Sequence, residues 1–176
     1  MKPTSQYPQA VPNHQKSSMS DDTLIISSEF IQRLAILTRK LGYVFNDLSL
    51  PKLALTHRSF DSKKNYERLE FLGDALLGMI VGEALYHRYP TQNEGRLTRM
   101  RATLVRQESL VIIAQNLELS NQLILGVGER KGGGRNRASI LADAVESLIG
   151  AIYLDSQDMD ITRDCVLSWY GDLIDN

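Results

Sequence analysis

Apolar residues along most of the chain recur at the three- and four-residue spacing of an amphipathic helix. The first such pattern follows Ser28 and ends before Gly42, a residue that suits a helix C-terminus. Its apolar positions are Phe30, Leu34, Leu37 and Leu41. Comparable patterns predict further helices at about residues 47–55, 66–89, 94–104, 108–117, 139–154 and 159–174. Because no stretch shows strand alternation, the sequence predicts an all-α fold of about seven helices.

Particular residues mark the ends of these helices. The candidate N-caps are Asn46 or Asp47, Asn93 and Ser139. Pro90 ends the long helix because proline has no backbone N–H to donate. Residues 126–136 read as a loop, with Gly132-Gly133-Gly134 as its flexible centre.

Residues 1–22 have a different composition from the rest of the chain. They hold three of the five prolines, separated by Ser and Gln, and few large apolar groups. Such a segment cannot bury enough apolar surface to fold, so we expect a disordered tail followed by one domain over residues 23–176. A partner-binding arm is the alternative, but the segment contains no recognisable motif.

The overall composition narrows the class of protein. The 176 residues are 43% hydrophobic and 23% charged, which is ordinary for a globular domain. No apolar run approaches the ~18–20 residues of a membrane span, and no secretory signal begins the chain. The single cysteine, Cys165, excludes an internal disulfide and a multi-cysteine zinc site, and it is expected to be a small buried hydrophobe. These features fit a soluble protein of a reducing cytoplasm.

The charges nearly balance but are unevenly distributed. With 20 basic and 21 acidic residues the net charge is -1, which argues against a generic basic nucleic-acid binder. Residues 96–137 nevertheless hold eight basic side chains against three acidic ones. Within this segment the glycine-containing loop carries bases suited to phosphate contact: Arg130, Lys131, Arg135 and Arg137. A simple linker is the alternative for this loop.

Acidic residues occur on two helices that are otherwise apolar. Residues 67–81 are apolar almost all the way round, which predicts a buried helix, yet Glu67, Glu70 and Asp74 share one stripe of it. The helix over residues 139–154 has Asp143 and Glu146 as the only charges of its apolar stretch, one turn apart.

Buried carboxylates cost several kcal/mol each unless they are paired or bind a metal. If the two helices pack together, Glu70, Asp74, Asp143 and Glu146 would form a cation site. All-oxygen ligands favour Mg²⁺ or Mn²⁺ over zinc. The alternative is a set of surface acids paired with arginines of the helix that follows Asn93. His57, His87 and His14 are expected to be structural, surface and tail residues and not ligands.

The stretch Glu-Arg-Leu-Glu-Phe-Leu-Gly-Asp-Ala-Leu-Leu at residues 67–77 resembles the signature of the ribonuclease III family. Residues 54–59, 94–101 and 140–151 match further family segments in the same order, so the resemblance covers about residues 30–171 and is to the bacterial catalytic domain. It implies the all-α endonuclease fold, a homodimer, and Mg²⁺-dependent hydrolysis of double-stranded RNA, with Mn²⁺ as a substitute. It also implies 5′-phosphate and 3′-hydroxyl products, processing of RNA precursors, and neither a membrane partner nor a small-molecule cofactor.

The resemblance assigns roles residue by residue. The family's metal ligands match Glu70, Asp74, Asp143 and Glu146, and we expect Asp74 and Glu146 to be the closest to the reaction. Glu67 and Glu94 match two further acids of the catalytic valley, although Glu94 also suits a helix start as a dipole-complementing acid. Phe71 matches the aromatic residue that inserts into the partner subunit, whereas from the residues alone it reads as core.

The chain departs from the family pattern in two places. Tyr66 stands where the family usually has Asn, and Asn65 lies one position earlier. The sequence also stops at Asn176 without the double-stranded-RNA-binding domain that normally follows, so we expect a catalytic-domain fragment in preference to a natural short form. A catalytically silent RNA-binding or dimerisation module is the competing function, but such a module has no reason to keep four costly acids.

Overall fold

The computed structural model describes residues 27–175, so the tail predicted at residues 1–22 lies outside the described residues. Its α-helices are α1 (Ser28–Leu41), α2 (Ser49–Ala54), α3 (Glu67–Arg88), α4 (Glu94–Val105), α5 (Gln107–Asn116), α6 (Val127–Lys131), α7 (Ala138–Ser156) and α8 (Met159–Tyr170). Short 3₁₀ turns cover Leu119–Asn121, Gly134–Asn136 and Gly171–Ile174. The extended backbone in this range pairs in one isolated bridge, Thr56 with Ile124, so the all-α prediction is confirmed.

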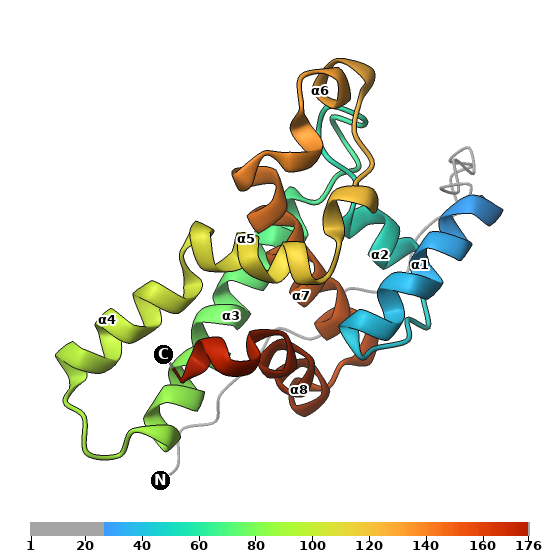
Figure 1. Ribbon diagram of the computed structural model, residues 1–176. Coiled ribbons are helices and arrows are strands. Elements are labelled where there is room, and N and C mark those ends of the chain that lie inside the picture. The colour runs from blue at the N-terminus through green and yellow to red at the C-terminus, as the bar shows by residue number, and fades with distance from the viewer. Residues whose placement is uncertain (1–26, 176) are drawn as a thin grey trace, which may run out of the picture.

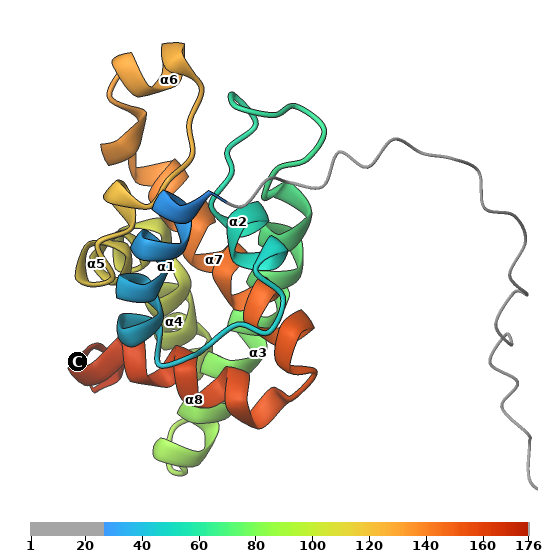
Figure 2. The ribbon, with the colours of Figure 1, turned by 90° about the vertical axis from the view of Figure 1, so that its right-hand side faces the viewer.

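Helices α3 and α7 lie side by side at the centre of the molecule (Figure 1). Helices α1 and α2 cover one side of this pair, α4 and α5 cover the other, and α8 lies across the end away from α6 (Figures 1 and 2). Most of α7 is buried, with Leu148, Ile149 and Ile152 fully enclosed. The pair α3 and α7 therefore forms the core on which the other helices pack. No helix within residues 27–175 has the length and hydropathy that a membrane span requires.

Two glycines allow α3 and α7 to meet backbone to backbone. A Cβ atom on Gly73 would lie 1.7 Å from the carbonyl oxygen of Glu146, and one on Gly150 would lie 2.5 Å from that of Leu69. Neither position has room for a side chain. The contact places the first turns of α3, which carry acids, against the turn of α7 that carries its acid pair.

Several helix ends follow the predicted local chemistry. The Ser27 hydroxyl accepts a hydrogen bond from the Phe30 N–H, and the Asn93 side chain accepts one from the Arg96 N–H. Gly42 ends α1 with a φ of 72°, a left-handed conformation that glycine adopts without steric cost. Asp47 accepts from the Ser49 N–H just before α2, which begins slightly later than predicted.

Other predicted boundaries are wrong. Residues 126–136 are not a plain loop, since they contain α6 and the turn Gly134–Asn136, with the chain reversing at Gly133 at a φ of 82°. Ser139 is not an N-cap: α7 begins at Ala138, and the flanking Arg137 makes no side-chain cap bond. The last helix stops at Tyr170, because Gly171 has a positive φ that breaks the helical path. The count is accordingly eight α-helices within residues 27–175.

Helix α3 is also not buried all round. Phe71 is 81% exposed, and Met79 and Tyr86 are exposed farther along the helix, while Leu77 and Ile80 on another face are fully buried. Its apolar composition thus serves two surfaces, one packed in the core and one open to solvent.

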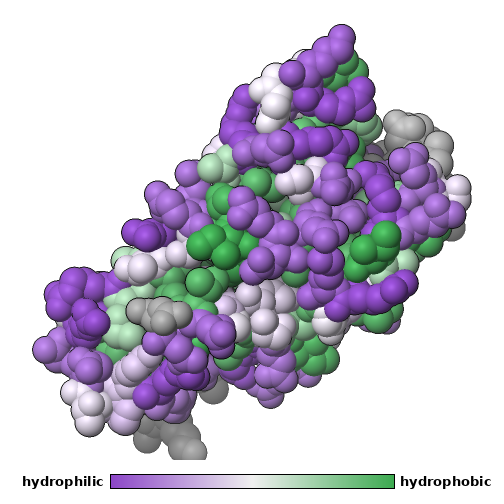
Figure 3. Space-filling model, in the orientation of Figure 1, coloured by the Kyte–Doolittle hydropathy of each residue, from purple (hydrophilic) through white to green (hydrophobic). Residues whose placement is uncertain are grey.

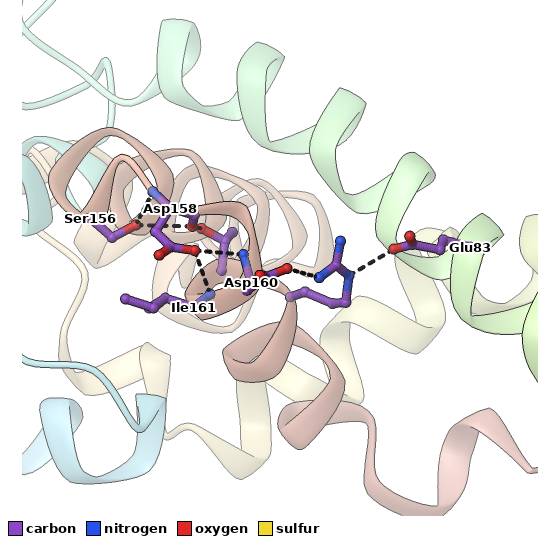
Figure 4. A network of polar contacts seen from close by, with 7 residues as sticks. Glu83, Ser156, Asp158, Asp160 and Ile161 are labelled. Carbon is purple, nitrogen blue, oxygen red and sulfur yellow. Dashed lines mark hydrogen bonds and ion pairs between the residues drawn. The ribbon is translucent and has the colours of Figure 1, made fainter.

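A polar network joins α7, α8 and α3 (Figure 4). Asp158 caps α8 by accepting from the backbone N–H groups of Asp160 and Ile161 at 2.8 and 3.2 Å. Arg163 of α8 pairs with Asp160 and reaches Glu83 of α3 at 2.7 Å. The carboxylates of this network are matched by donors, so they hold helices in place.

Candidate metal centre

Three carboxylates from α3 and α7 converge where the two helices cross. One carboxylate oxygen from each of Glu70, Asp143 and Glu146 lies within 4.8 Å of the other two. Glu70 and Asp143 are half-buried, and so is Glu146. The structure thus brings together three of the four side chains predicted to form a cation site.

The fourth predicted ligand, Asp74, lies at the edge of this group. It follows Glu70 by one turn of α3 and is exposed, so the prediction of a buried helix is wrong at this position. It remains close enough to act electrostatically, because its charge contributes to raising the pKa values of Glu70 and Glu146. Asp74 is therefore the acid of the set most open to solvent.

The carboxylates of this group repel one another, and burial further disfavours their charged forms. Burial, followed by repulsion from Asp74, Asp143 and Glu70, raises the pKa of Glu146 to about 8. Burial also raises the pKa values of Glu70 and Asp143. Among the ion pairs of residues 27–175, none involves these three acids. Clustered oxygen donors with excess negative charge fit a hard divalent cation.

Tyr66 contacts this group, and sequence reasoning noted it only as a departure from the family pattern. The residue precedes α3 and is 2% exposed, and its hydroxyl donates to Asp143 Oδ2 at 3.1 Å. Its ring meets the His57 ring edge to face at 5.7 Å. A tyrosine next to the first acid of α3 carried no sequence signal for a partner 77 positions away.

The two further predicted acids lie apart from each other. Glu67 is exposed and pairs with Arg58 at 3.4 Å. Glu94 begins α4, beyond the far end of α3, and about 27 Å of helix separates Glu70 from Arg88. Its carboxylate accepts from the Thr98 hydroxyl at 2.9 Å. Within one chain Glu94 does not join the acid group. It lies at the start of α4, where the alternative interpretation placed it as a dipole-complementing acid.

The arginines of α4 do not neutralise the acid group either. Arg96 and Arg99 line an apolar hollow between α4, α5 and the C-terminal turn, together with Leu104 and Ile174. This hollow lies in the apolar strip seen in that region of Figure 3. The alternative in which those arginines pair with the acids is therefore wrong for this chain.

The four bases predicted to contact RNA divide into two pairs. Arg135 donates to the Ser120 carbonyl at 2.7 Å, and Arg137 pairs with Glu129 at 2.9 Å, so both hold their own segment in place. Arg130 and Lys131 are exposed on α6, at an end of the molecule whose surface is mostly hydrophilic (Figure 3).

The loop before α3 lies beside the α6 segment at this end (Figure 2), where the Gly126 N–H donates to the Ser59 hydroxyl at 3.0 Å. His57 shares a 2.8 Å hydrogen bond with that hydroxyl, and burial lowers its pKa. His87 is exposed and His14 lies outside the described residues. Cys165 is buried, as predicted.

Comparisons with known proteins identify the family of the chain. Residues 47–170 match the family model described as ribonuclease-III-like. The chain is 95% identical over its full length to Ribonuclease 3 of Psychrobacter arcticus, and 62% identical over 140 residues to that of Acinetobacter pittii. It spans 66% and 61% of the lengths of these relatives.

A solved structure shares the fold. The nuclease domain of ribonuclease III from Campylobacter jejuni superimposes with a TM-score of 0.75 at 41% identity, covering 77% of this chain and 94% of that one. That nuclease domain shows structural flexibility in a region involved in dimer formation.

Proposed function

Because the chain belongs to the ribonuclease-III-like family, we propose that it is a metal-dependent endonuclease that hydrolyses phosphodiester bonds in double-stranded RNA. The observation that carries the proposal is the convergence of Glu70, Asp143 and Glu146, half-buried and without basic partners. A folded domain keeps such an arrangement at a cost in stability, and binding a cation compensates that cost.

The residues that would hold Mg²⁺, or Mn²⁺ in its place, are Glu70, Asp143 and Glu146, with Asp74 completing the site from its exposed position. When bound, such ions lower the pKa of a coordinated water and stabilise charge on a phosphate. Asp74 and Glu146 are the acids we assign closest to the reacting phosphate. Products with 5′-phosphate and 3′-hydroxyl ends follow if water attacks the phosphorus and the 3′ oxygen is the leaving group.

RNA contact is assigned to the end of the molecule that carries α6. A-form RNA is bound mainly through phosphates and 2′-hydroxyls, so exposed cations at this end can contact the backbone without reading bases. Arg130 and Lys131 fill this role, while Arg135 and Arg137 keep the segment folded. The substrates we propose are duplex regions of ribosomal and other RNA precursors in the cytoplasm.

A homodimer would let each subunit cut one strand. Phe71 is 81% exposed beside the acid group, an unusual place for a large aromatic ring on a free surface. A hollow lined by Leu50, Leu53, Leu72 and Leu154 adjoins the same ring. We assign this surface to subunit contact, with Phe71 as its anchor.

A cleavage assay tests the proposed function. A long RNA duplex incubated with the protein and Mg²⁺ should be cut to short duplexes, and EDTA should abolish the cutting. Single-stranded RNA of the same sequence and a DNA duplex serve as controls. A protein that binds the duplex but leaves it intact in both Mg²⁺ and Mn²⁺ would instead be the catalytically silent module.

A further inference from the structure

Tyr66 connects the two helices that carry the acid group. Its backbone carbonyl accepts from the N–H groups of Leu69 and Glu70 at 2.8 and 2.9 Å, closing the first turn of α3. Its hydroxyl donates to Asp143 Oδ2 on α7 at 3.1 Å. One residue thus touches the backbone of one candidate ligand and the side chain of another.

Tyr66 is itself held in place on several sides. Its backbone N–H donates to the Thr56 carbonyl at 2.9 Å, and its ring packs against His57. At 2% exposure the ring has no freedom to leave this position. Its hydroxyl is therefore a fixed donor, and the orientation of the Asp143 carboxylate depends on it.

We propose that Tyr66 is a positioning residue that fixes the Asp143 carboxylate so that it can share a cation with Glu70 and Glu146. The inference rests on the proposed function, since it presumes that the acid group binds a metal. With Oδ2 engaged by the phenol, the other oxygen of Asp143 is left for the ion. Partners of metal ligands commonly set ligand orientation in this way, and their loss weakens metal affinity by about 10- to 100-fold.

A second hydrogen bond from a tyrosine to a carboxylate of α7 provides a matched control. Tyr43 also donates its hydroxyl to a carboxylate of α7, at 2.7 Å from Asp155 Oδ2, but at the opposite end of the helix from the acid group. Tyr66→Phe and Tyr43→Phe therefore remove the same atom and the same kind of hydrogen bond. They differ in whether the carboxylate belongs to the acid group.

The test measures Mn²⁺ affinity of the two variants and the wild-type protein by calorimetry, without RNA. Tyr66→Phe should bind Mn²⁺ about 10-fold or more weakly, and Tyr43→Phe should bind as the wild type does. The Mg²⁺ concentration for half-maximal cleavage should rise in Tyr66→Phe alone, with duplex binding in EDTA unchanged. Because a bound ion stabilises the folded state, the rise in Tm with added Mn²⁺ gives the same ranking even if Tyr66→Phe starts from a lower Tm.

The outcomes separate this inference from the proposed function. Equal Mn²⁺ affinity in Tyr66→Phe and the wild type would show that Tyr66 only packs the core, and it would leave the metal site standing. Equal weakening in both variants would overturn the inference, because a general loss of stability would then explain it. A wild-type protein that binds no Mn²⁺ would overturn the metal site and the role of Tyr66 together.

Discussion

Helix α7 holds acidic side chains in two contrasting environments, one near each end. Asp143 and Glu146 face Glu70 across the crossing with α3, and within residues 27–175 the side-chain donor that reaches Asp143 is the Tyr66 hydroxyl. Asp155 lies in the last turn and accepts four hydrogen bonds. They come from the Tyr43 hydroxyl, the backbone and side chain of Asn46, and the Asp47 backbone.

The pKa values of these acids shift in opposite directions. Burial alone would raise the pKa of Asp155, but the hydrogen bonds from Asn46, Tyr43 and Asp47 outweigh it and hold that pKa below its usual value. At the other end, burial and neighbouring carboxylates raise the pKa of Glu146 to about 8. Burial acts to raise the pKa of both carboxyl groups, so the opposite direction at Asp155 comes from its hydrogen bonds.

Hydrogen-bond donors lower the pKa of Asp155, whereas burial and repulsion raise that of Glu146, and this contrast in partners indicates different roles. Asp155 is satisfied as an anion and ties the segment between α1 and α2 to α7. In the acid group, by contrast, the donor that reaches the carboxylates within residues 27–175 is the Tyr66 hydroxyl on Asp143, so an external cation can bind the remaining oxygens. Acids that stabilise a fold and acids kept for chemistry can therefore be told apart on one helix by their partners.

The two ends of α7 should differ most in how substitutions there change the cleavage rate. Glu146→Gln keeps the side-chain shape but removes the charge, so metal affinity should fall and the cleavage rate should drop on the order of 1,000-fold, about 4 kcal/mol of transition-state stabilisation. Duplex binding should persist, because Arg130 and Lys131 are untouched. Asp155→Asn is the matched control and should cleave at close to the wild-type rate. Near wild-type cleavage by Glu146→Gln in ordinary Mg²⁺ would remove the basis for the two-helix site.

The stability of the fold, in contrast to the cleavage rate, should depend strongly on Asp155. Asp155→Ala strands the donors of Asn46, Asp47 and Tyr43, so the free energy of unfolding should fall by about 2–3 kcal/mol. Urea unfolding followed by circular dichroism in EDTA measures this change. Asp164→Ala, which removes an exposed acid of α8, should change it by less than about 0.5 kcal/mol. If the two substitutions cost the same, the hydrogen bonds to Asp155 contribute nothing net and the comparison of the two ends fails.

The sequence predicted the local features of both ends and missed the contacts between distant residues. Helix periodicity and caps such as Asn93 are local, so most helix ranges were right to within a few residues. The acid pair on α7 was conspicuous because its surroundings are apolar. Asp155 carried no such signal, since its value depends on backbone groups more than 100 positions away.

The crossing of α3 and α7 shows the same limit. Gly73 and Gly150 are ordinary helix glycines in the sequence, and only the packed structure reveals that a Cβ atom at either position would collide with the facing backbone. The bases after Gly126 were predicted as one group, but in the fold Arg135 donates to the Ser120 carbonyl and Arg137 pairs with Glu129. Charge alone does not distinguish an exposed cation from one that binds its own chain.

The smallest effect, and the one that compares both ends in a single titration, is the pH dependence of stability without metal. Glu146 has a folded pKa of about 8, well above the value of ~4.5 expected for an unfolded glutamate. Between these values the folded state retains a proton that the unfolded state has lost, so stability must fall as pH rises toward 8. Asp155 contributes with the opposite sign, but because its pKa is lowered, its contribution is lost only in the acid range.

His57, whose pKa is lowered, makes stability rise with pH, and that rise ends near its unfolded value of ~6.5. The interval from pH 6.5 to 8 therefore isolates the acid group. Urea unfolding in EDTA should show a loss of about 1–2 kcal/mol across it. Glu146→Gln should flatten the profile, whereas Asp155→Asn should leave its slope unchanged. Added Mg²⁺ should flatten the slope, because the ion binds the ionised carboxylates and displaces the proton that the folded state retains. A flat wild-type profile in EDTA would mean that Glu146 is already compensated in the folded chain, and the contrast along α7 would be lost.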